Sequence, residues 1–444
     1  MLAVALLAGG AAVVQQRGDG PDAPDPVVTS SPAALPDRGV FLAARTEAAM
    51  PTPAGLRAVV ATALADPALG GQLAAAVVDV ETGEVLLDRR GDASVIPAST
   101  AKIATAVAAL SELDAEARLS TRVVAGATPG QVVLVGGGDP TLNGTREVPA
   151  VPVVATVADL AAQVTASGVR VTSVVVDDSL YTGPLLGPAW RPSYVTDGDV
   201  APVTALQVDG GRSSEQGPRS QQPSLAAGRA LAVALGVPDA PVTEGVAAPG
   251  AAPLGEVRSP TIAQLTEIML TRSDNDLAEA LARQVALATG QPASFEGAAL
   301  AVDRALAAVV PGSPPEQIAL VDASGLSRSD RLEPLGLARL LATVAGPDET
   351  GRWSPVLSGL PVAGFDGTLG RRFREGPSTT AAGVVRGKTG TLNGVSALAG
   401  LVRTRDGRLL AFDLTADAVP LGANRGAEDA LDALAAALAS CGCR

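Results

Sequence analysis

The chain has 444 residues, a formal net charge of −13 and no histidine. The missing histidine excludes Ser-His-Asp and Cys-His catalytic arrangements and removes the commonest zinc ligand. The acidic balance argues against nucleic acid as a partner, because phosphate contacts need clustered basic side chains. Apolar residues make up 47% of the chain. That share is enough for a sizeable core, and the length favours two or three domains.

An apolar run, Leu2 to Val14, opens the chain and is followed by a stretch rich in Pro, Asp, Gly and Ser. The run is short for a membrane-spanning helix, which needs about 20 residues. It fits the apolar part of a signal peptide or a signal anchor, with a buried helix of the fold as the alternative. We therefore predict a signal peptide or anchor over residues 1–16 and a flexible linker over residues 17–48. This order indicates a body held outside a membrane, secreted or anchored in the cell envelope.

Regular structure is predicted from about Leu56 onward. Residues 100–113 predict a helix, because Ile103, Val107 and Leu110 are spaced for one face. Ser99 lies at the start of this helix, and Lys102 lies one turn later on the same side. The segments before it predict one helix and one hairpin, over residues 56–64, 74–80 and 84–88.

Residues 118–243 differ in character from their surroundings. Short Val-rich runs alternate there with Gly and Pro clusters, which is typical of a separate strand-containing insertion. Residues 259–289 then predict two helices with Ser273-Asp274-Asn275 in the turn between them. Three strands and a closing helix follow, over residues 384–391, 396–402, 409–415 and 428–438.

Helices segregated against an antiparallel sheet make an α+β body. We expect this body to be discontinuous, over residues 49–117 and 244–444, with residues 118–243 as an inserted domain. Cys441 and Cys443 are the only cysteines. A loop closed over one residue is strained, and chain ends tend to fray, so a frayed tail is the prediction there.

Only two of the 33 basic residues are lysines, Lys102 and Lys388, and both lie in short motifs. Lys102 closes Ser99-Thr100-Ala101-Lys102, and Lys388 opens Lys388-Thr389-Gly390. A guanidinium stays protonated in proteins, whereas a buried ammonium can lose its proton. A GC-rich genome also makes lysine rare, but it does not explain why both remaining lysines lie in motifs.

These motifs together predict nucleophilic catalysis without histidine. A serine hydroxyl is a weak nucleophile unless a base takes its proton, and Lys102 can reach Ser99 from the next turn. Burial and the nearby charge of Lys388 would lower the pKa of Lys102. Ser273 can relay a proton to a leaving amine, and the amide of Asn275 can bind both a substrate carbonyl and a catalytic side chain.

The strand that starts at Lys388 is the predicted binding edge. Lys388 and Thr389 can hold an anionic end of a substrate, with Gly390 and Thr391 completing the edge. The backbone N–H groups of Ser99 and Thr391 can receive a developing oxyanion. Each motif is weak alone, but three in this order at the starts of the right elements favour one shared active site.

With these residues the chain resembles the penicillin-recognising serine peptidases. More narrowly, it is similar to the D-alanyl-D-alanine carboxypeptidase/endopeptidase family, the class C low-molecular-mass penicillin-binding proteins. The resemblance covers about residues 50–440. Besides the three motifs, it is carried by residues 134–142, 177–179, 201–206, 324–328, 367–369 and 372–373.

The resemblance implies a penicillin-binding-protein/β-lactamase-like fold and an acylation–deacylation cycle on peptidoglycan stem peptides. Ser99 would attack the D-Ala-D-Ala carbonyl with Lys102 as base, and Ser273 would pass the proton to the departing D-Ala. Asn275 would position the substrate, and Lys388 and Thr389 would grip its terminal carboxylate. β-Lactams would act as inhibitors. The resemblance implies neither a metal nor a cofactor.

The chain departs from the family pattern in three ways, and three different functions compete with this interpretation. Fewer residues separate Ser99 from Ser273 than in the family's large members, which indicates a reduced inserted subdomain. The segment after residue 206 lacks the family's Asn-rich stretch, and Asp330 stands where an Asn is usual. A β-lactamase is the nearest rival, and Glu333-Pro334-Leu335-Gly336 superficially resembles its deacylation site but lacks the Asn. A related serine esterase and a non-catalytic peptidoglycan-binding protein also compete. Carboxypeptidase and endopeptidase activity both remain open.

Overall fold

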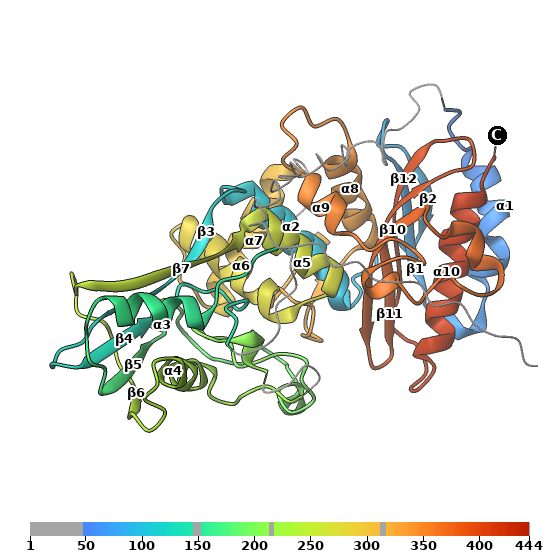
Figure 1. Cartoon of the computed structure of the whole chain (residues 1–444). Coiled ribbons are helices and arrows are strands. Elements are labelled where there is room, and N and C mark those ends of the chain that lie inside the picture. Colours follow the sequence, from blue (N-terminus) through green and yellow to red (C-terminus); the bar gives the residue numbers. More distant parts are fainter. Residues whose placement is uncertain (1–47, 145–151, 213–216, 311–316, 444) are drawn as a thin grey trace, which may run out of the picture. The chain divides into compact units, whose positions relative to one another are not determined.

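The computed structural model describes residues 48–144, 152–212, 217–310 and 317–443. One five-stranded antiparallel sheet carries the Lys-Thr-Gly motif (Figure 1). Its order is β10-β11-β12-β1-β2, with bounds β1 (Ala74–Asp79), β2 (Val85–Arg89), β10 (Val385–Leu392), β11 (Val395–Arg403) and β12 (Leu409–Ala416). The predicted hairpin and the three predicted C-terminal strands are confirmed. Because β10 is an edge strand of this sheet, one side of the motif has no neighbouring strand of the sheet.

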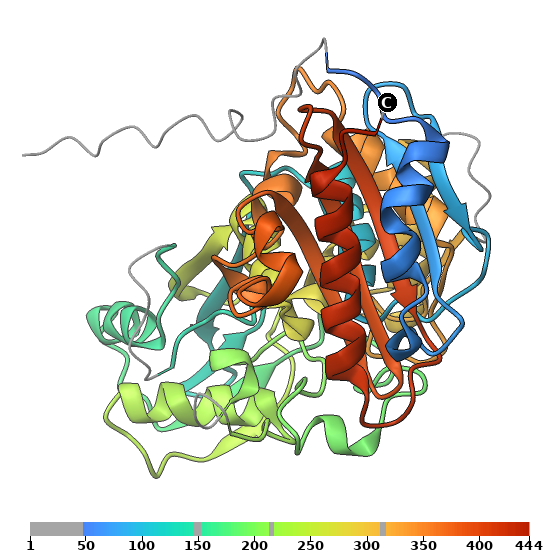
Figure 2. The same cartoon turned by 90° about the vertical axis from the view of Figure 1, so that its right-hand side faces the viewer.

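Both faces of this sheet are buried at its three central strands, β1, β11 and β12, which are accordingly nearly continuous apolar runs. Alternate residues of a strand point to opposite faces. In β1, Ala75 and Val77 pack with α1 (Pro53–Leu64) and α10 (Asn424–Ser440), which cross the face seen in Figure 2. Ala76 and Val78 pack instead with the helices on the opposite face.

The helix that carries Lys102, α2 (Ala101–Glu112), is surrounded by other helices. Every residue from Ala101 to Leu110 is buried, so the helix has no solvent face in this part. The prediction of one apolar face was therefore too narrow, because neighbouring helices enclose α2. Those neighbours are α5 (Ile262–Arg272), α6 (Asn275–Ala288), α7 (Phe295–Val309), α8 (Pro334–Ala345) and α9 (Ser354–Gly359).

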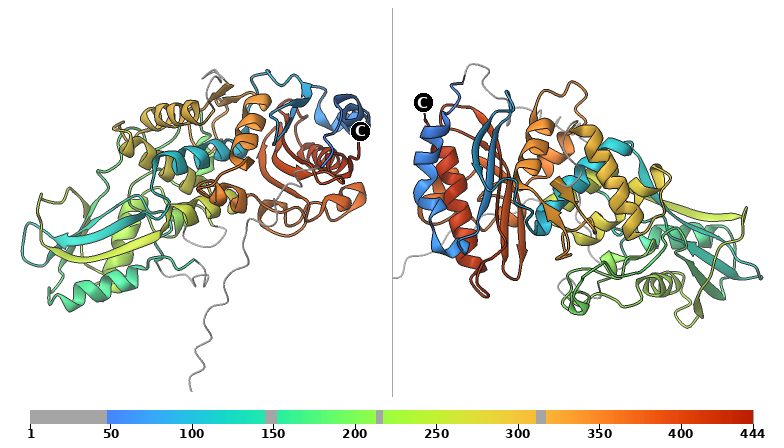
Figure 3. Two further views of the ribbon diagram at one scale, coloured as in Figure 1. Left: turned by 90° about the horizontal axis from the view of Figure 1, so that it is seen from above. Right: turned by 180° about the vertical axis from the view of Figure 1, so that it is seen from behind.

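A second five-stranded sheet has the order β6-β5-β4-β3-β7 (Figure 3). Its strands are β3 (Arg118–Ala125), β4 (Gln131–Val135), β5 (Ser173–Asp177), β6 (Val242–Glu244) and β7 (Pro253–Thr261). Two helices, α3 (Val157–Ala166) and α4 (Pro223–Ala234), pack on one face of it. A small two-stranded sheet joins β8 (Ile318–Ala319) to β9 (Arg331–Leu332).

The second sheet extends past residue 243, the predicted end of the insertion. Its edge strand β7 pairs antiparallel with β3 along most of its length, so residues 253–261 belong to this sheet. The reason is that β7 returns the chain directly to α5 through residue Thr261, the N-cap of that helix. The second sheet therefore ends later in the chain than the predicted insertion, at Thr261 and not at residue 243.

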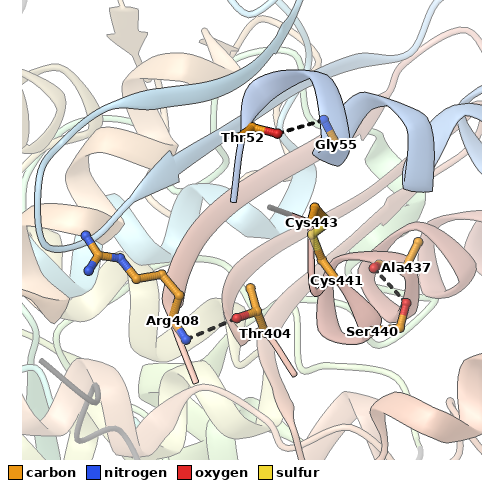
Figure 4. The surroundings of a disulfide bond; sticks show 8 residues. All are labelled: Thr52, Gly55, Thr404, Arg408, Ala437, Ser440, Cys441 and Cys443. Carbon is orange, nitrogen blue, oxygen red and sulfur yellow. Dashed lines mark hydrogen bonds between the residues drawn. A yellow bond between two sulfur atoms is a disulfide. The ribbon is translucent and has the colours of Figure 1, made fainter. Parts of the chain in front are cut away.

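The C-terminal tail is packed, and the prediction of a frayed end is wrong. Cys441 and Cys443 are joined by a disulfide, and both are buried among apolar residues of α1 and α10 (Figure 4). The backbone N–H of Thr52 donates to the carbonyl of Cys443 at 2.8 Å. Burial of the two side chains and this hydrogen bond hold the tail against the start of α1.

The predictions for residues 1–16 and for most of the linker lie outside the described residues. Within the described ranges, no helix has the length and apolar character needed to cross a membrane. The same ranges contain no group of three or more His, Cys, Asp or Glu side chains placed to hold a metal ion.

Candidate active site

Ser99 and Lys102 lie at the entry to α2. Ser99 is in a single 3-10 turn, Ala98–Thr100, that leads into the helix. Ala98 has a left-handed backbone, with φ of 48°, which is uncommon for a residue with a side chain. The turn leaves Ser99 half-buried, and the Nζ of Lys102 donates to its Oγ at 2.9 Å. The predicted contact between these two side chains is present.

The amine of Lys102 has three oxygen neighbours and is fully buried. Besides Ser99 Oγ, they are Asn275 Oδ1 at 2.6 Å and the backbone carbonyl of Ser324 at 2.5 Å. An ammonium has three protons to give to these three acceptors. A neutral amine has two protons and one lone pair. Because the amide and the carbonyl can only accept, they take the two protons and leave the lone pair directed at Ser99.

Asn275 and Ser273 are presented by the junction of α5 and α6. The first helix ends at Ser273, whose φ of 57° is again left-handed, and the side chain of Asp274 caps the next helix by accepting from Leu277 N at 2.9 Å. Strained backbone of this kind persists where the surroundings enforce it, often at functional sites. The Nδ2 of Asn275 donates to the carbonyl of Asp199 at 2.9 Å, which fixes the amide with its oxygen toward Lys102.

Lys388 forms a second lysine–serine pair. It is fully buried on β10, and its Nζ donates to Ser273 Oγ at 2.8 Å and to the carbonyl of Thr389 at 2.9 Å. The ammonium is therefore turned toward Ser273 and away from solvent. The structure thus forms two lysine–serine pairs, Lys102 with Ser99 and Lys388 with Ser273. Asn275, two residues after Ser273, contacts Lys102 and so brings the helical motif to the first pair.

The other predicted residues of β10 lie along the strand edge. Thr389 hydrogen-bonds through its hydroxyl to that of Thr368 at 2.8 Å, and exposed Thr391 donates to Glu428 Oε1 at 3.0 Å. Gly390 passes close to the turn that carries Ser99. A Cβ at Gly390 would come within 2.7 Å of the carbonyl oxygen of Pro97, so a side chain would push strand and turn apart.

Burial lowers the pKa values of both lysines. For Lys102 the pKa falls to about 8, because desolvation outweighs the opposing effect of nearby carboxylates, of which Asp322 is the strongest. For Lys388 the pKa is held well below 10.5 by burial and then by the positive charge of Lys102. Both shifts favour a neutral amine over an ammonium, and a proton on one lysine disfavours a proton on the other.

Three residues hold the loop that carries the Ser324 carbonyl. No role was predicted for them from the sequence. Buried Glu279 accepts from the backbone N–H groups of Ala323 and Ser324, both at 3.0 Å. Asp322 accepts from Ser324 N at 3.1 Å and from Gly325 N at 2.7 Å. Thr105, one turn after Lys102, donates to the Ala323 carbonyl at 2.7 Å.

A sequence signal existed for one of these residues. Glu279 follows Asn275 by one helical turn, in a helix segment that is otherwise largely apolar. A carboxylate at such a position needs a buried partner, because burying an unpaired charge is costly. Its second oxygen is paired with Arg283 at 3.0 Å, where both side chains are 1% exposed.

A cavity of about 670 Å³ opens beside Ser273 and Asn275. Arg272, Arg212 and Asp199 are among its lining residues, so both signs of charge face it. The cavity reaches the Pro140–Asn143 turn that follows β4. Ser99, Lys102 and Lys388 are not among its lining residues, so the cavity lies on the Ser273 and Asn275 side of the site. The arrangement as a whole can activate one hydroxyl and hold a second hydroxyl near a cation.

Comparison with known proteins identifies the family. The model of the D-Ala-D-Ala carboxypeptidase 3 (S13) family matches residues 56–216 and 212–438. A carboxypeptidase of Mycobacterium tuberculosis is 42% identical over 407 residues, which cover 89% of this chain and 86% of that protein. The carboxypeptidase DacB of Mycolicibacterium smegmatis is 41% identical over 457 residues, which cover 100% of this chain and 95% of that protein.

The fold also matches a solved structure. Penicillin-binding protein 4 (DacB) of Haemophilus influenzae superposes with a TM-score of 0.64 at 21% identity, over 79% of this chain and 91% of that chain. This likeness supports the α+β penicillin-binding-protein fold. The chain belongs to the D-Ala-D-Ala carboxypeptidase 3 (S13) family and is a serine-type D-Ala-D-Ala carboxypeptidase, a hydrolase.

Proposed function

We propose that this carboxypeptidase releases the terminal D-Ala from peptidoglycan stem peptides through an acyl-enzyme on Ser99. One observation carries the proposal: the Lys102 amine lies 2.9 Å from Ser99 Oγ while two acceptor-only oxygens occupy its other directions. A buried neutral amine in this position is a base aimed at one hydroxyl.

In the acylation step, Ser99 Oγ attacks the carbonyl carbon of the D-Ala–D-Ala bond, and Lys102 takes the hydroxyl proton. The tetrahedral intermediate then expels the amine of the last D-Ala. Ser273 donates its proton to that amine and is reprotonated through the two lysines, because Lys388 contacts it at 2.8 Å. The products are free D-Ala and an ester on Ser99.

In the deacylation step, water attacks the ester carbonyl and gives a proton to Lys102. Lys102 passes that proton to the Ser99 oxygen as the bond between this oxygen and the acyl carbon breaks. The peptide departs with a new terminal carboxylate, and Ser99 is restored. β-Lactams would form the same ester, but their ring keeps the leaving amine attached. The Haemophilus influenzae protein has been solved in complex with a β-lactam, and we propose that β-lactams inhibit this chain in the same way.

The proposal is tested with diacetyl-Lys-D-Ala-D-Ala, with mass spectrometry of the products. The wild-type protein should release one D-Ala, and Ser99→Ala should abolish the release. Labelled penicillin should bind the wild-type protein covalently and not the variant. Hydrolysis retained in Ser99→Ala would contradict the mechanism. Binding of peptidoglycan without penicillin labelling would instead favour a non-catalytic wall-binding protein.

Lifetime of the acyl-enzyme distinguishes this function from a β-lactamase. A penicillin-binding protein should keep the label for minutes or longer, whereas release within seconds would indicate efficient β-lactam hydrolysis. Glu333, the residue that resembles a β-lactamase deacylation group, is the N-cap residue of α8.

Endopeptidase activity is a second candidate, favoured by the cavity beside Ser273. In the proposed mechanism the leaving group lies on the Ser273 side. The volume of about 670 Å³ there exceeds what a single D-Ala requires, and its lining carries Arg272 and Asp199. Cleavage of a cross-linked muropeptide, compared with the linear peptide under the same conditions, tests this candidate.

Location and domain organisation are proposals of the same kind. Peptidoglycan lies outside the cytoplasmic membrane, so we propose that the body acts in the cell envelope, secreted or tethered through the N-terminal segment. We also propose that the second sheet with its helices is an inserted domain. Fractionation of cells that produce the full chain would test the location.

A further inference from the structure

The loop between β8 and β9, residues 320–330, carries the Ser324 carbonyl that binds Lys102. Asp330 lies at the end of this loop and is fully buried. Its Oδ1 accepts from the backbone N–H groups of Val321 at 2.8 Å and Asp322 at 3.3 Å. One carboxyl oxygen therefore ties the end of the loop to its start.

Asp322 organises the middle of the same loop. Its Oδ1 accepts from Ser324 N and Gly325 N, and its Oδ2 accepts from Ser327 N at 2.7 Å and Trp190 Nε1 at 2.6 Å. An ionised carboxylate has about four lone-pair directions for such donors, and a proton on either oxygen would displace one of them. Asp322 is therefore the ionised member of any pair that it forms.

The carboxyl of Asp330 hydrogen-bonds to the carboxyl of Asp322. Two ionised carboxylates can only accept, so this contact requires a proton, and the four donors at Asp322 leave that proton to Asp330. The Oδ2 of Asp330 suits it, because this oxygen is buried and no donor among the described residues reaches it. Burial, and then the negative charge of Asp322, holds the pKa of Asp330 well above 3.8.

Other charged or titratable groups lie near this pair of carboxyls. They are Lys102 on α2, Glu279 with its partner Arg283 on α6, Tyr194 at the end of a 3-10 turn, and Arg328 and Arg331 at the end of the loop. The Nη1 of Arg331 donates to the backbone carbonyls of Arg328 and Asp330, at 2.9 and 2.7 Å. A negative charge on Asp330 would raise the pKa of Lys102, as that of Asp322 does.

We propose that Asp330 is a positioning residue, which carries the single proton of the Asp322–Asp330 pair and donates it to Asp322. This contact holds the loop in the shape that keeps the Ser324 carbonyl against the Lys102 amine. Loss of the proton would set two carboxylates against each other inside the loop. The inference rests on the proposed function, since the carbonyl matters to the reaction only if Lys102 is the base.

Two replacements of Asp330 test this role on diacetyl-Lys-D-Ala-D-Ala. Asp330→Asn keeps an oxygen for Val321 N and an N–H for Asp322, whereas Asp330→Leu has a similar size and neither group. At about pH 7 the kcat/KM of Asp330→Asn should stay within about threefold of wild type. That of Asp330→Leu should fall at least about tenfold, mainly in kcat. Equal losses in the two variants would contradict the proposal.

Asp322→Asn is the matched control, because it makes the same change in the other member of the pair. An amide has one oxygen and cannot accept from four N–H groups, so kcat/KM should fall at least about tenfold. If Asp322→Asn were as active as Asp330→Asn, or more active, the proton would not belong to Asp330.

The acid limb of the kcat/KM profile reports the charge of Asp330. If a neutral carboxyl is replaced by a neutral amide, the limb of Asp330→Asn should stay within about 0.3 pH unit of wild type. Removal of an ionised carboxylate would instead lower the pKa of Lys102 and move the limb further than this to lower pH, against the proposal.

Urea unfolding tests the proton without any activity measurement. Asp330 has a higher pKa in the folded protein than in the unfolded chain, so folding takes up a proton between these two values. Wild-type stability should therefore fall as pH rises from about 4 toward the folded pKa, and Asp330→Asn lacks this fall. The midpoint of the variant, relative to wild type, should be at least about 0.3 M higher at about pH 8 than at about pH 5.

A difference in midpoint that does not change with pH would overturn the inference, even if every variant were active. Failure of wild-type protein to cleave the peptide or to bind penicillin would overturn the proposed function itself.

Discussion

The buried cations of this protein fall into two groups with opposite surroundings. Arg408 directly precedes β12 and lies outside the three motifs. It binds Asp79 through Nε at 2.5 Å and through Nη2 at 2.7 Å. Arg372 and Arg283 are likewise bound to buried carboxylates. Within the described ranges, Lys102 and Lys388 hydrogen-bond instead to hydroxyl, amide and carbonyl oxygens, without a direct carboxylate contact.

This difference separates cations that hold the fold from cations that can change charge. The carboxylate of Asp79 raises the pKa of Arg408, so that pair stays ionised. The lysines have neutral acceptors only, so burial lowers their pKa values toward neutral pH. The chain uses Arg in the first role and Lys in the second, as expected if the second role requires loss of a proton.

The largest expected effect is that of replacing Lys102. Lys102→Arg keeps a cation that cannot act as a base, and Lys102→Met removes the cation as well. Both variants should lose at least about 10³-fold in kcat/KM on diacetyl-Lys-D-Ala-D-Ala, because the activating base for Ser99 is gone. Steady-state kinetics measure the loss, with urea midpoints to confirm folding.

The Arg variant decides what Lys102 supplies. Equal losses in both variants mean that proton acceptance, not positive charge, is required. If Lys102→Arg kept more than about a tenth of wild-type activity, the contrast between the two groups of cations would fail.

Removing the carboxylate partner of an arginine should lower stability and leave activity nearly unchanged. Asp79→Asn removes the buried carboxylate partner of Arg408 and leaves only the exposed carboxylate of Glu81, which should cost about 3 kcal/mol in the free energy of unfolding. The kcat/KM of the folded protein should change less than about twofold. Urea unfolding at constant slope and peptide hydrolysis measure the two effects. A stable variant with low activity would show that this pair also serves the site.

The sequence allowed some parts of this contrast to be predicted. Ser99, Lys102, Ser273 and Lys388 are each recognisable because their residue types suit the proposed chemistry and because the motifs start regular elements. The strand and helix periods around them were strong enough to place those elements. The two lysine–serine pairs that these residues form were expected from these local signals.

Other parts depend on contacts that leave no local signal. The third oxygen at Lys102 belongs to the backbone of Ser324, and any residue type has such a carbonyl. Pairing of β7 with β3 joins residues more than 100 positions apart, which periodicity cannot reveal. The packed tail was missed because burial of Cys441 depends on α1, at the other end of the described chain.

The pH dependence of kcat/KM should reflect the titration of the two lysines, which have no direct carboxylate contact among the described residues. Lys102 must be neutral to accept the Ser99 proton, so protonation removes activity. With the pKa of Lys102 lowered to about 8, kcat/KM should rise as pH increases through this range. It should fall about tenfold per pH unit below it. Because the two lysines interact, the apparent pKa belongs to the pair. A flat profile from about pH 6 to 9 would contradict the assignment of a lysine base.

The smallest expected effect is that of replacing Glu279, which contacts a residue of each group of cations or acts on it. This carboxylate pairs with Arg283, accepts from Ser324 N, and its charge raises the pKa of Lys102. Burial raises the pKa of Glu279 itself, while Arg283 and the two backbone donors oppose that shift. Glu279→Gln keeps an acceptor oxygen for the loop and removes the charge.

Loss of that charge should lower the pKa of Lys102, so the acid limb of the kcat/KM profile should move to lower pH, by less than about one unit. The maximal kcat should fall no more than about tenfold, because the amide still accepts from the loop. A larger fall with an unmoved limb would mean that Glu279 is uncharged in the native site and acts on Lys102 only through the position of the Ser324 carbonyl. The limb and the maximum together therefore separate an electrostatic effect on the base from a geometric one.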